Sequence, residues 1–134
     1  MSAIERPTAR AHRELAGVLR EGDLAIDATA GNGHDTVFLA GRVGERGQVI
    51  AFDIQAEAIA SSRERVAAAS LTDRVAFVQG SHAGLGSHVI PGSVTAIVFN
   101  LGYLPGGDHA VITRSEDSLL ALEASLVALK EGGL

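Results

Sequence analysis

Short apolar runs alternate with longer stretches of helical periodicity along the 134-residue chain, and turn residues separate them. Four apolar runs are expected to be strands, at residues 24–28, 48–53, 74–79 and 94–99. The last of these is almost continuously apolar, which is typical of a strand buried on both faces. Strands that alternate with helices in this way predict an α/β fold with a parallel sheet.

The remaining periodic stretches predict helices. Their expected ranges are 8–22, with Thr8 as the N-cap, then 35–42, 55–70 and 113–130, with a loop or short helix at 81–92. Inward positions are expected at Leu15 and Leu19 of the first helix and at Ile59 and Val66 of the third. In the last helix the expected buried stripe is Leu119, Leu122, Leu126 and Leu129.

A glycine-rich turn follows the first expected strand, in the sequence Asp27-Ala28-Thr29-Ala30-Gly31-Asn32-Gly33-His34-Asp35-Thr36. Ligands of parallel α/β sheets bind outside the carboxyl ends of the strands. Gly31 and Gly33 allow the backbone to approach a ligand closely, and the start of the next helix offers free N–H groups. The turn is therefore a candidate ligand-binding loop.

The charges around this loop favour one cofactor over another. A dinucleotide fingerprint requires G-x-G-x-x-G, but Thr36 occupies the third glycine position and an acid, Asp27, ends the strand. A carboxylate suits the ammonium and sulfonium of S-adenosylmethionine better than the pyrophosphate of NAD. Asp53 ends the second strand, where a carboxylate can accept both ribose hydroxyls of either cofactor.

Four segments carry a resemblance to a known family: residues 27–36, Phe52-Asp53-Ile54-Gln55, Ser81-His82 and residues 100–108. With these segments the chain resembles class I S-adenosylmethionine-dependent methyltransferases, and among them the bacterial YtqB-type rRNA methylase family. The resemblance implies a Rossmann-like three-layer sandwich with a mostly parallel sheet in the strand order 3-2-1-4.

The residues and the resemblance together define an expected site. The cofactor-binding residues are expected to be Asp27, Thr29, Gly31, Asn32, Gly33, His34, Asp35, Thr36, Asp53, Ile54, Gln55, Ser81 and His82. Asn100 is expected to hold the N–H of a target amine, as in the N-P-P-Y motif of amino-group methyltransferases, and Tyr103 to pack on a uracil ring. Leu101 and Gly102 replace the two prolines of that motif, which makes the analogy looser. His12 is expected either to cover the cofactor pocket or to lie at the surface.

The resemblance implies methylation of RNA, specifically of the 5-aminomethyl group of a modified wobble uridine in tRNA. Methylation of a small amine is an alternative, as is a fragment that binds the cofactor without turnover. An NAD-type oxidoreductase is a further alternative, which Asp27 and the missing third glycine make unfavourable.

Composition excludes some chemistry. The absence of cysteine excludes disulfides, thiolate nucleophiles and cysteine-ligated metals, and the five histidines form no metal-binding motif, so no metal is expected. The net charge of −5 argues against a wholly basic surface, although Asp27, Asp35 and Asp53 account for part of it. No apolar run reaches the length of a membrane span, and a cytoplasmic protein is expected.

Residues 1–134 are expected to form one domain that is the N-terminal part of a seven-stranded fold, with the later strands missing. Leu134 is expected to be the first residue of a fifth strand. The fourth strand would then have an open apolar edge, which favours a homodimer or a swapped assembly.

Overall fold

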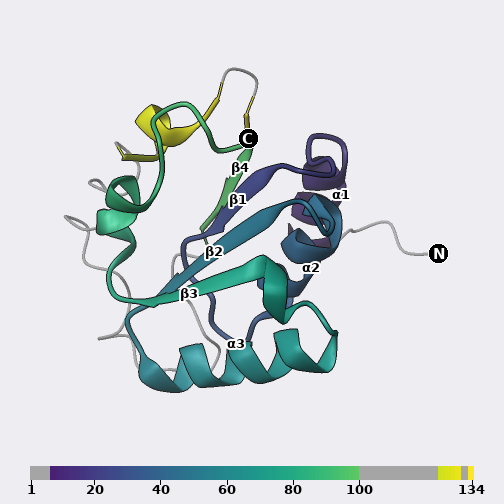
Figure 1. Cartoon of the computed structure of the whole chain (residues 1–134), viewed down its shortest axis with the longest axis vertical. Helices are drawn as coiled ribbons and strands as arrows, with labels where there is room; N and C mark the ends of the chain where they lie inside the picture. Colours follow the sequence, from purple (N-terminus) through teal and green to yellow (C-terminus); the bar gives the residue numbers. More distant parts are fainter. Residues whose placement is uncertain (1–6, 100–123, 131–132) are drawn as a thin grey trace.

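The computed structural model describes residues 7–99, 124–130 and 133–134, in which four parallel strands form one sheet (Figure 1). The strands are β1 (Leu24–Asp27), β2 (Gln48–Asp53), β3 (Val75–Gln79) and β4 (Ala96–Val98). Their order in the sheet is β3-β2-β1-β4, and all three pairings are parallel. The predicted α/β fold with strand order 3-2-1-4 is confirmed.

Helical segments cover both faces of the sheet. The α-helices are α1 (Pro7–Ala16), α2 (His34–Val43) and α3 (Ala56–Ala68), and the 3-10 helices are η1 (Thr72–Arg74) and η2 (His82–His88). Residues 124–128 are also helical. In Figure 1 the three α-helices lie on one side of the strands, and η2 lies with residues 124–128 on the other side. This gives the three layers of a sandwich.

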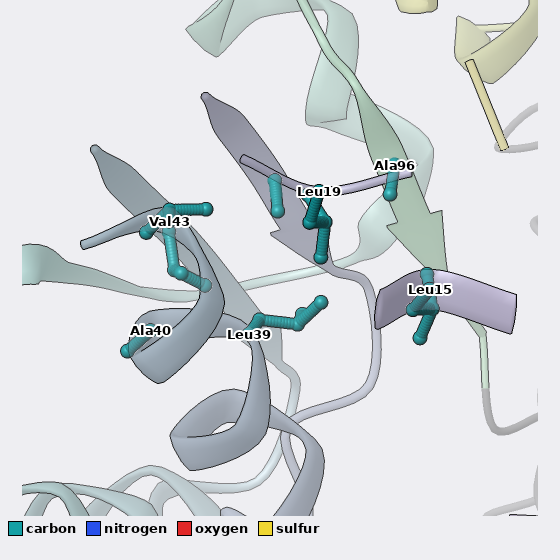
Figure 2. Close-up of a cluster of buried hydrophobic side chains, with 8 residues drawn as sticks. Leu15, Leu19, Leu39, Ala40, Val43 and Ala96 are labelled. Carbon is teal, nitrogen blue, oxygen red and sulfur yellow. The ribbon is translucent and has the colours of Figure 1, made fainter. Parts of the chain in front are cut away.

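The alternation of side chains along each strand divides the core into two clusters. Ala25 and Val49 face the α-helices and pack with Leu15, Leu39 and other residues of α1 and α2 (Figure 2). Their immediate neighbours, Ile26 and Ile50, point to the opposite face and pack with η2 and residues 124–129. The strands are therefore apolar on both faces, as a buried parallel sheet requires.

The strand register brings the carboxyl ends to one edge. Asp27, the last residue of β1, lies beside Ala51 of β2 and Val98 of β4. Asp53, the last residue of β2, lies beside Gln79, the last residue of β3. The loops that leave these ends are consequently neighbours in space.

The first helix differs from its prediction at both ends. Pro7 is its first residue and Thr8 lies inside it, so Thr8 is not the N-cap. Proline fits the first turn because it has no N–H to leave unpaired there. The helix ends at Ala16, where the Gly17 N–H bonds to the Glu14 carbonyl, instead of continuing to Gly22. The boundaries of α2, α3 and the four strands agree with the prediction to within two residues, whereas η2 ends at His88, four residues before the end of its predicted segment.

The fourth strand is shorter than predicted, because β4 spans residues 96–98 of the expected 94–99. Val94 forms an isolated bridge with Leu129 instead. Leu134 lies beside β4: its N–H donates to the Thr95 carbonyl at 2.9 Å, and its carbonyl accepts from the Ile97 N–H at 2.8 Å. It therefore pairs with backbone groups on the free edge of β4.

The predicted leucine stripe of the last helix is only partly right at its two described positions: Leu129 is half-buried and packs against the core, but Leu126 is not buried. Leu126 is 78% exposed, whereas Ser125 and Ala128 are buried. Backbone hydrogen bonds fix which face of this helical segment meets the core. The Gly92 N–H donates to the Val127 carbonyl, and the Val94 N–H donates to the Ala128 carbonyl. The small residues therefore face the sheet. Leu119, Leu122 and the start of this helix lie outside the described residues.

Two leucine-to-alanine variants test this assignment of the core. Leu39 is fully buried in the α-helical cluster, so Leu39→Ala should lower the free energy of unfolding by about 3 kcal/mol through lost burial and a cavity. Leu126→Ala should change it by less than about 0.5 kcal/mol, because that side chain is largely in solvent. Urea unfolding followed by circular dichroism measures both. Equal losses would show that Leu126 is buried after all.

Candidate functional site

A buried acid organises the loop that leaves β1. The Asp27 carboxyl group is fully enclosed, and it accepts hydrogen bonds from the Thr36 hydroxyl at 2.7 Å and from the Thr29 N–H at 3.1 Å. It therefore ties the start of the loop to the first turn of α2. The side chain is not exposed, so the structure places Asp27 beneath the loop, and its predicted role beside a cationic ligand stays a prediction. Asp27 shapes the loop from beneath.

Burial raises the pKa of Asp27 from 3.8 to about 6, because an enclosed carboxylate loses its hydration. The hydrogen bonds from Thr36 and Thr29 lower this pKa, whereas the charges of Asp35 and Asp53 raise it further. The charges of two neighbouring carboxylates therefore act on the buried acid.

The carboxylate of Asp53 holds the middle of the same loop. One oxygen accepts from the Gly31 N–H at 3.0 Å, and the other accepts from the Gln55 N–H at 2.9 Å. A carboxylate has about four acceptor sites, so these two bonds leave capacity for further donors. Ile54, the next residue, is 56% exposed and presents an apolar side chain beside the carboxylate.

Helix α3 supports the loop from behind. The Ser62 hydroxyl donates to the Gly31 carbonyl at 2.9 Å, and the Arg65 Nε–H donates to the Asn32 carbonyl at 2.7 Å. Gly33 has φ +86°, and a Cβ atom there would lie 2.9 Å from the Ser62 Cα. The loop therefore requires glycine at position 33 for its conformation and for its close approach to α3.

Sequence reasoning missed Ser62 and Arg65 as supports of this loop. The side chain of Arg65 is exposed, but its guanidinium folds back onto the loop. Ser62 and Arg65 lie 31 and 33 positions along the chain from their partners, so no local sequence motif predicts these contacts.

His12 joins α1 to the start of α2. Its Nε2 lies 2.6 Å from Oδ1 of Asp35, and its ring stacks on Phe38 with centroids 3.9 Å apart. Asp35 is in the first turn of α2, directly after the glycine loop. His12 is thus next to the loop and half-buried, so it is not a free surface histidine, and its expected covering of a cofactor pocket stays a prediction.

The end of β3 reaches across to the end of β1. Ser81 caps η2, and its hydroxyl oxygen accepts from the Ala83 N–H at 3.1 Å. The next residue, His82, is buried, and its Nδ1 lies 3.3 Å from the Ala28 carbonyl oxygen. Its ring also meets Phe99, after β4, edge to face at 5.6 Å.

Most of the predicted cofactor residues therefore meet along the carboxyl ends of β1, β2 and β3. His34 instead lines an open groove of about 310 Å³ between α2 and α3, together with Val37, Arg65, Ala68 and Ala69.

The predicted catalytic residues, Asn100 and Tyr103, lie outside the described residues. Among the residues that the structure does describe, no cluster of three or more His, Asp or Glu could hold a metal ion. Within those same segments, no helix is long and apolar enough to cross a membrane.

The sheet order, the glycine loop after β1 and the acid at the end of β2 define a Rossmann-like α/β protein. Residues 49–134 match a protein family described as "Putative rRNA methylase", and the chain belongs to this family.

Known proteins extend this assignment. The chain is 37% identical over 140 residues to "tRNA (mnm(5)s(2)U34)-methyltransferase, chloroplastic" of Arabidopsis thaliana, a match that covers 97% of the chain and 51% of that protein. The crystal structure of a "putative rRNA-methylase" of Clostridium thermocellum is 40% identical in sequence, with a TM-score of 0.89. The match covers 96% of this chain and 68% of the Clostridium chain. The structure of a "putative methyltransferase" of Streptococcus mutans in complex with SAH is 37% identical in sequence, with a TM-score of 0.86. This match covers 97% of this chain and 70% of the Streptococcus chain. This chain thus spans about half the length of the Arabidopsis relative.

The buried acid gives stability a specific pH dependence. Asp27 keeps its proton up to about pH 6 in the folded protein but loses it near pH 3.8 when unfolded. Stability should therefore fall as pH rises through this window, by roughly 3 kcal/mol for a shift of this size. Asp27→Asn cannot ionise, so the difference in unfolding free energy between wild type and this variant should change by most of that amount between pH 4 and pH 7.

Urea unfolding at pH 4, 5, 6 and 7 measures this difference. Asp73→Asn is the control, because Asp73 is exposed and its replacement should leave the pH profile of the wild type unchanged. A constant difference between wild type and Asp27→Asn would show that Asp27 titrates like an exposed acid.

Proposed function

We propose that this chain binds S-adenosylmethionine and acts in methyl transfer to RNA. The Asp53 carboxylate carries the proposal: the N–H groups of Gly31 and Gln55 hold it at the end of β2, with acceptor sites left over for the two hydroxyls of a ribose. The Streptococcus mutans relative in complex with SAH supports this choice of ligand.

The charges favour S-adenosylmethionine over a dinucleotide. In dinucleotide-binding folds the pyrophosphate lies against the start of the helix after β1. Here Asp35 occupies the first turn of that helix and would repel a pyrophosphate. S-adenosylmethionine carries no phosphate, and its two positive charges are stabilised near Asp35 and Asp53.

The residues present fit this cofactor. Asp53 would accept the ribose hydroxyls, the exposed side chain of Ile54 would pack on the adenine, and the loop of residues 29–33 would lie along the amino-acid part. Bound S-adenosylmethionine supplies a methyl group on a sulfonium centre, which is reactive toward a neutral amine. The protein's task is then to orient the amine, since positioning supplies much of the rate in such a displacement.

For the substrate we propose tRNA, and within it the amine of a 5-aminomethyl-type wobble uridine. The Arabidopsis relative is a tRNA methyltransferase by its name, and the family is described as an rRNA methylase. Asn100 is proposed to hold the amine N–H and Tyr103 to pack on the uracil. A small-molecule amine remains the alternative substrate, and binding without turnover is the other alternative.

Isothermal titration calorimetry tests the cofactor. S-adenosylhomocysteine should bind more tightly than NAD, and Asp53→Asn should weaken its affinity at least tenfold, because the amide offers fewer acceptor sites for the ribose. Asp73→Asn, an exposed acid on η1, is the matched control and should bind like wild type. Tighter binding of NAD than of S-adenosylhomocysteine would reject the proposal.

Tritium transfer from S-adenosylmethionine to bulk tRNA tests the substrate. Label should appear in tRNA, and Asn100→Ala should lower the rate about 100-fold while leaving the affinity for S-adenosylhomocysteine unchanged, because Asn100 is assigned to the substrate. Cofactor binding without labelling of tRNA would favour a small amine or a chain without turnover.

The remaining expectations stay predictions. The homodimer rests on the free edge of β4, part of which Leu134 now occupies with two backbone hydrogen bonds. The cytoplasmic location rests on composition alone.

A further inference from the structure

We propose that the groove between α2 and α3 binds a single-stranded segment of RNA. Its phosphates lie on Arg65 and Arg74, and a base packs on the apolar side chains between these two arginines. This inference rests on the proposed function and adds to it a docking surface for the nucleotides next to the target. Of the residues expected at the cofactor, only His34 lines this groove.

The middle of the groove is apolar. It has a volume of about 310 Å³ and is lined there by Val37 of α2 and by Ala68 and Ala69 of α3. Both alanines are exposed to solvent. Unstacked bases of single-stranded RNA bind by packing their flat faces on protein side chains, whereas the bases of a duplex are stacked on one another. The groove therefore offers a surface for an unstacked base.

Each end of the groove carries a guanidinium group. Arg65 lies next to the glycine loop, where its Nε–H donates to the Asn32 carbonyl at 2.7 Å. Arg74 lies at the other end: its Nη1 donates to the Ala40 carbonyl at 3.1 Å, and Ala40 is one turn of α2 beyond Val37. The stretch of α2 from its start to Ala40 is about 9 Å long. One nucleotide with its two flanking phosphates can cover this span.

The charge of the groove differs from that of the whole chain. The chain has a net charge of −5, yet none of the described residues that line the groove is acidic. Within the described segments no carboxylate forms an ion pair with Arg65 or Arg74. A guanidinium has several N–H donors, so each arginine keeps some for phosphate oxygens beyond its bond to a carbonyl. The groove is thus complementary in charge to an RNA backbone.

The groove begins at the candidate site. His34 directly follows Gly33, and Arg65 holds a carbonyl of the same glycine loop. An RNA strand in the groove therefore passes beside this loop, while the target nucleotide reaches over the ends of the strands. An acidic peptide has the charge but lacks flat bases for the apolar middle. RNA is the occupant that uses both features.

Fluorescence anisotropy of a labelled single-stranded oligouridylate tests the groove. Ala68→Glu places a carboxylate between the two arginines and should weaken RNA binding about tenfold, because it repels the phosphates. Ala60→Glu is the matched control, since Ala60 is exposed on the same helix but lies about 12 Å along its axis from Ala68. This distance exceeds the range of unscreened charge, so its RNA affinity should stay within about twofold of wild type.

The salt dependence of binding tests Arg74. Arg74→Gln should lower the slope of log K against log salt concentration by about 0.7, because one phosphate contact of a single strand is lost. Arg42→Gln is the matched control: Arg42 also donates to a backbone carbonyl, that of Ala16, but toward α1 and away from the groove. Its slope should equal that of wild type. All four variants should bind S-adenosylhomocysteine like wild type, and urea unfolding shows whether each is folded.

Methyl NMR of the unchanged protein provides a test that does not depend on the variants. The methyl resonances of Val37 and Ala68 should shift when the oligouridylate is added, whereas those of Val43, which is buried in the core, should not. Polyglutamate should bind more weakly than RNA and leave the Val37 methyls in place.

Three results overturn the inference: RNA binding that leaves the Val37 methyls unmoved, equal RNA affinities of folded Ala68→Glu and Ala60→Glu, and polyglutamate binding as tight as that of RNA. If wild type binds RNA and one of these results is found, only the groove assignment fails. If wild type binds S-adenosylhomocysteine but no RNA, the RNA substrate of the proposed function is rejected, and this inference with it.

Discussion

The hydrogen bond from the Gly31 N–H to the Asp53 carboxylate joins the loop after β1 to the end of β2, and the geometry of the candidate site depends on it. It exists because the parallel register ends both strands at the same edge of the sheet. The same carboxylate also accepts from Gln55, so one side chain sets the position of two loops. A charge-assisted bond of this kind is stronger than one between neutral groups, which suits a loop that must hold its shape before a ligand arrives.

The loop is held from three further sides. Asp27 anchors its start from beneath, Ser62 and Arg65 hold two of its carbonyl groups from α3, and Asp35 links its end to His12 of α1. These contacts use up hydrogen-bonding groups on the inner side of the loop. What remains toward the edge of the sheet is the unfilled acceptor capacity of Asp53 and the exposed side chain of Ile54.

The acids at the ends of β1 and β2, Asp27 and Asp53, differ in function because they differ in burial. Asp27 is enclosed, and its raised pKa reflects a support role inside the protein. Asp53 is only partly buried and is stabilised by two backbone donors, so its carboxylate is available at the surface of the site. Asp35 and Asp53 therefore favour a cationic cofactor more than the enclosed Asp27 does.

Predictions from the sequence were most successful where the signal is local. The apolar runs located all four strands, and the glycine turn with Asp53 located the edge of the sheet that carries the site. The Leu126 prediction was wrong because a periodic pattern states which residues share a helix face and leaves open which face meets the core. Backbone pairing of residues 92–94 with residues 127–130 made that choice and turned the small residues inward.

The sequence by itself therefore determined the class of fold, the strand order through its family resemblance, and the loops that can form a site. Only the tertiary structure decided which side chains support the loop and which of the nearby acids is enclosed. Asp27 supports the loop from beneath, and Ser62 and Arg65 became visible as its supports on α3. The physical reason is that burial and hydrogen bonding depend on contacts between residues about 30 to 50 positions apart, and no spacing along the chain encodes which of two acids becomes enclosed.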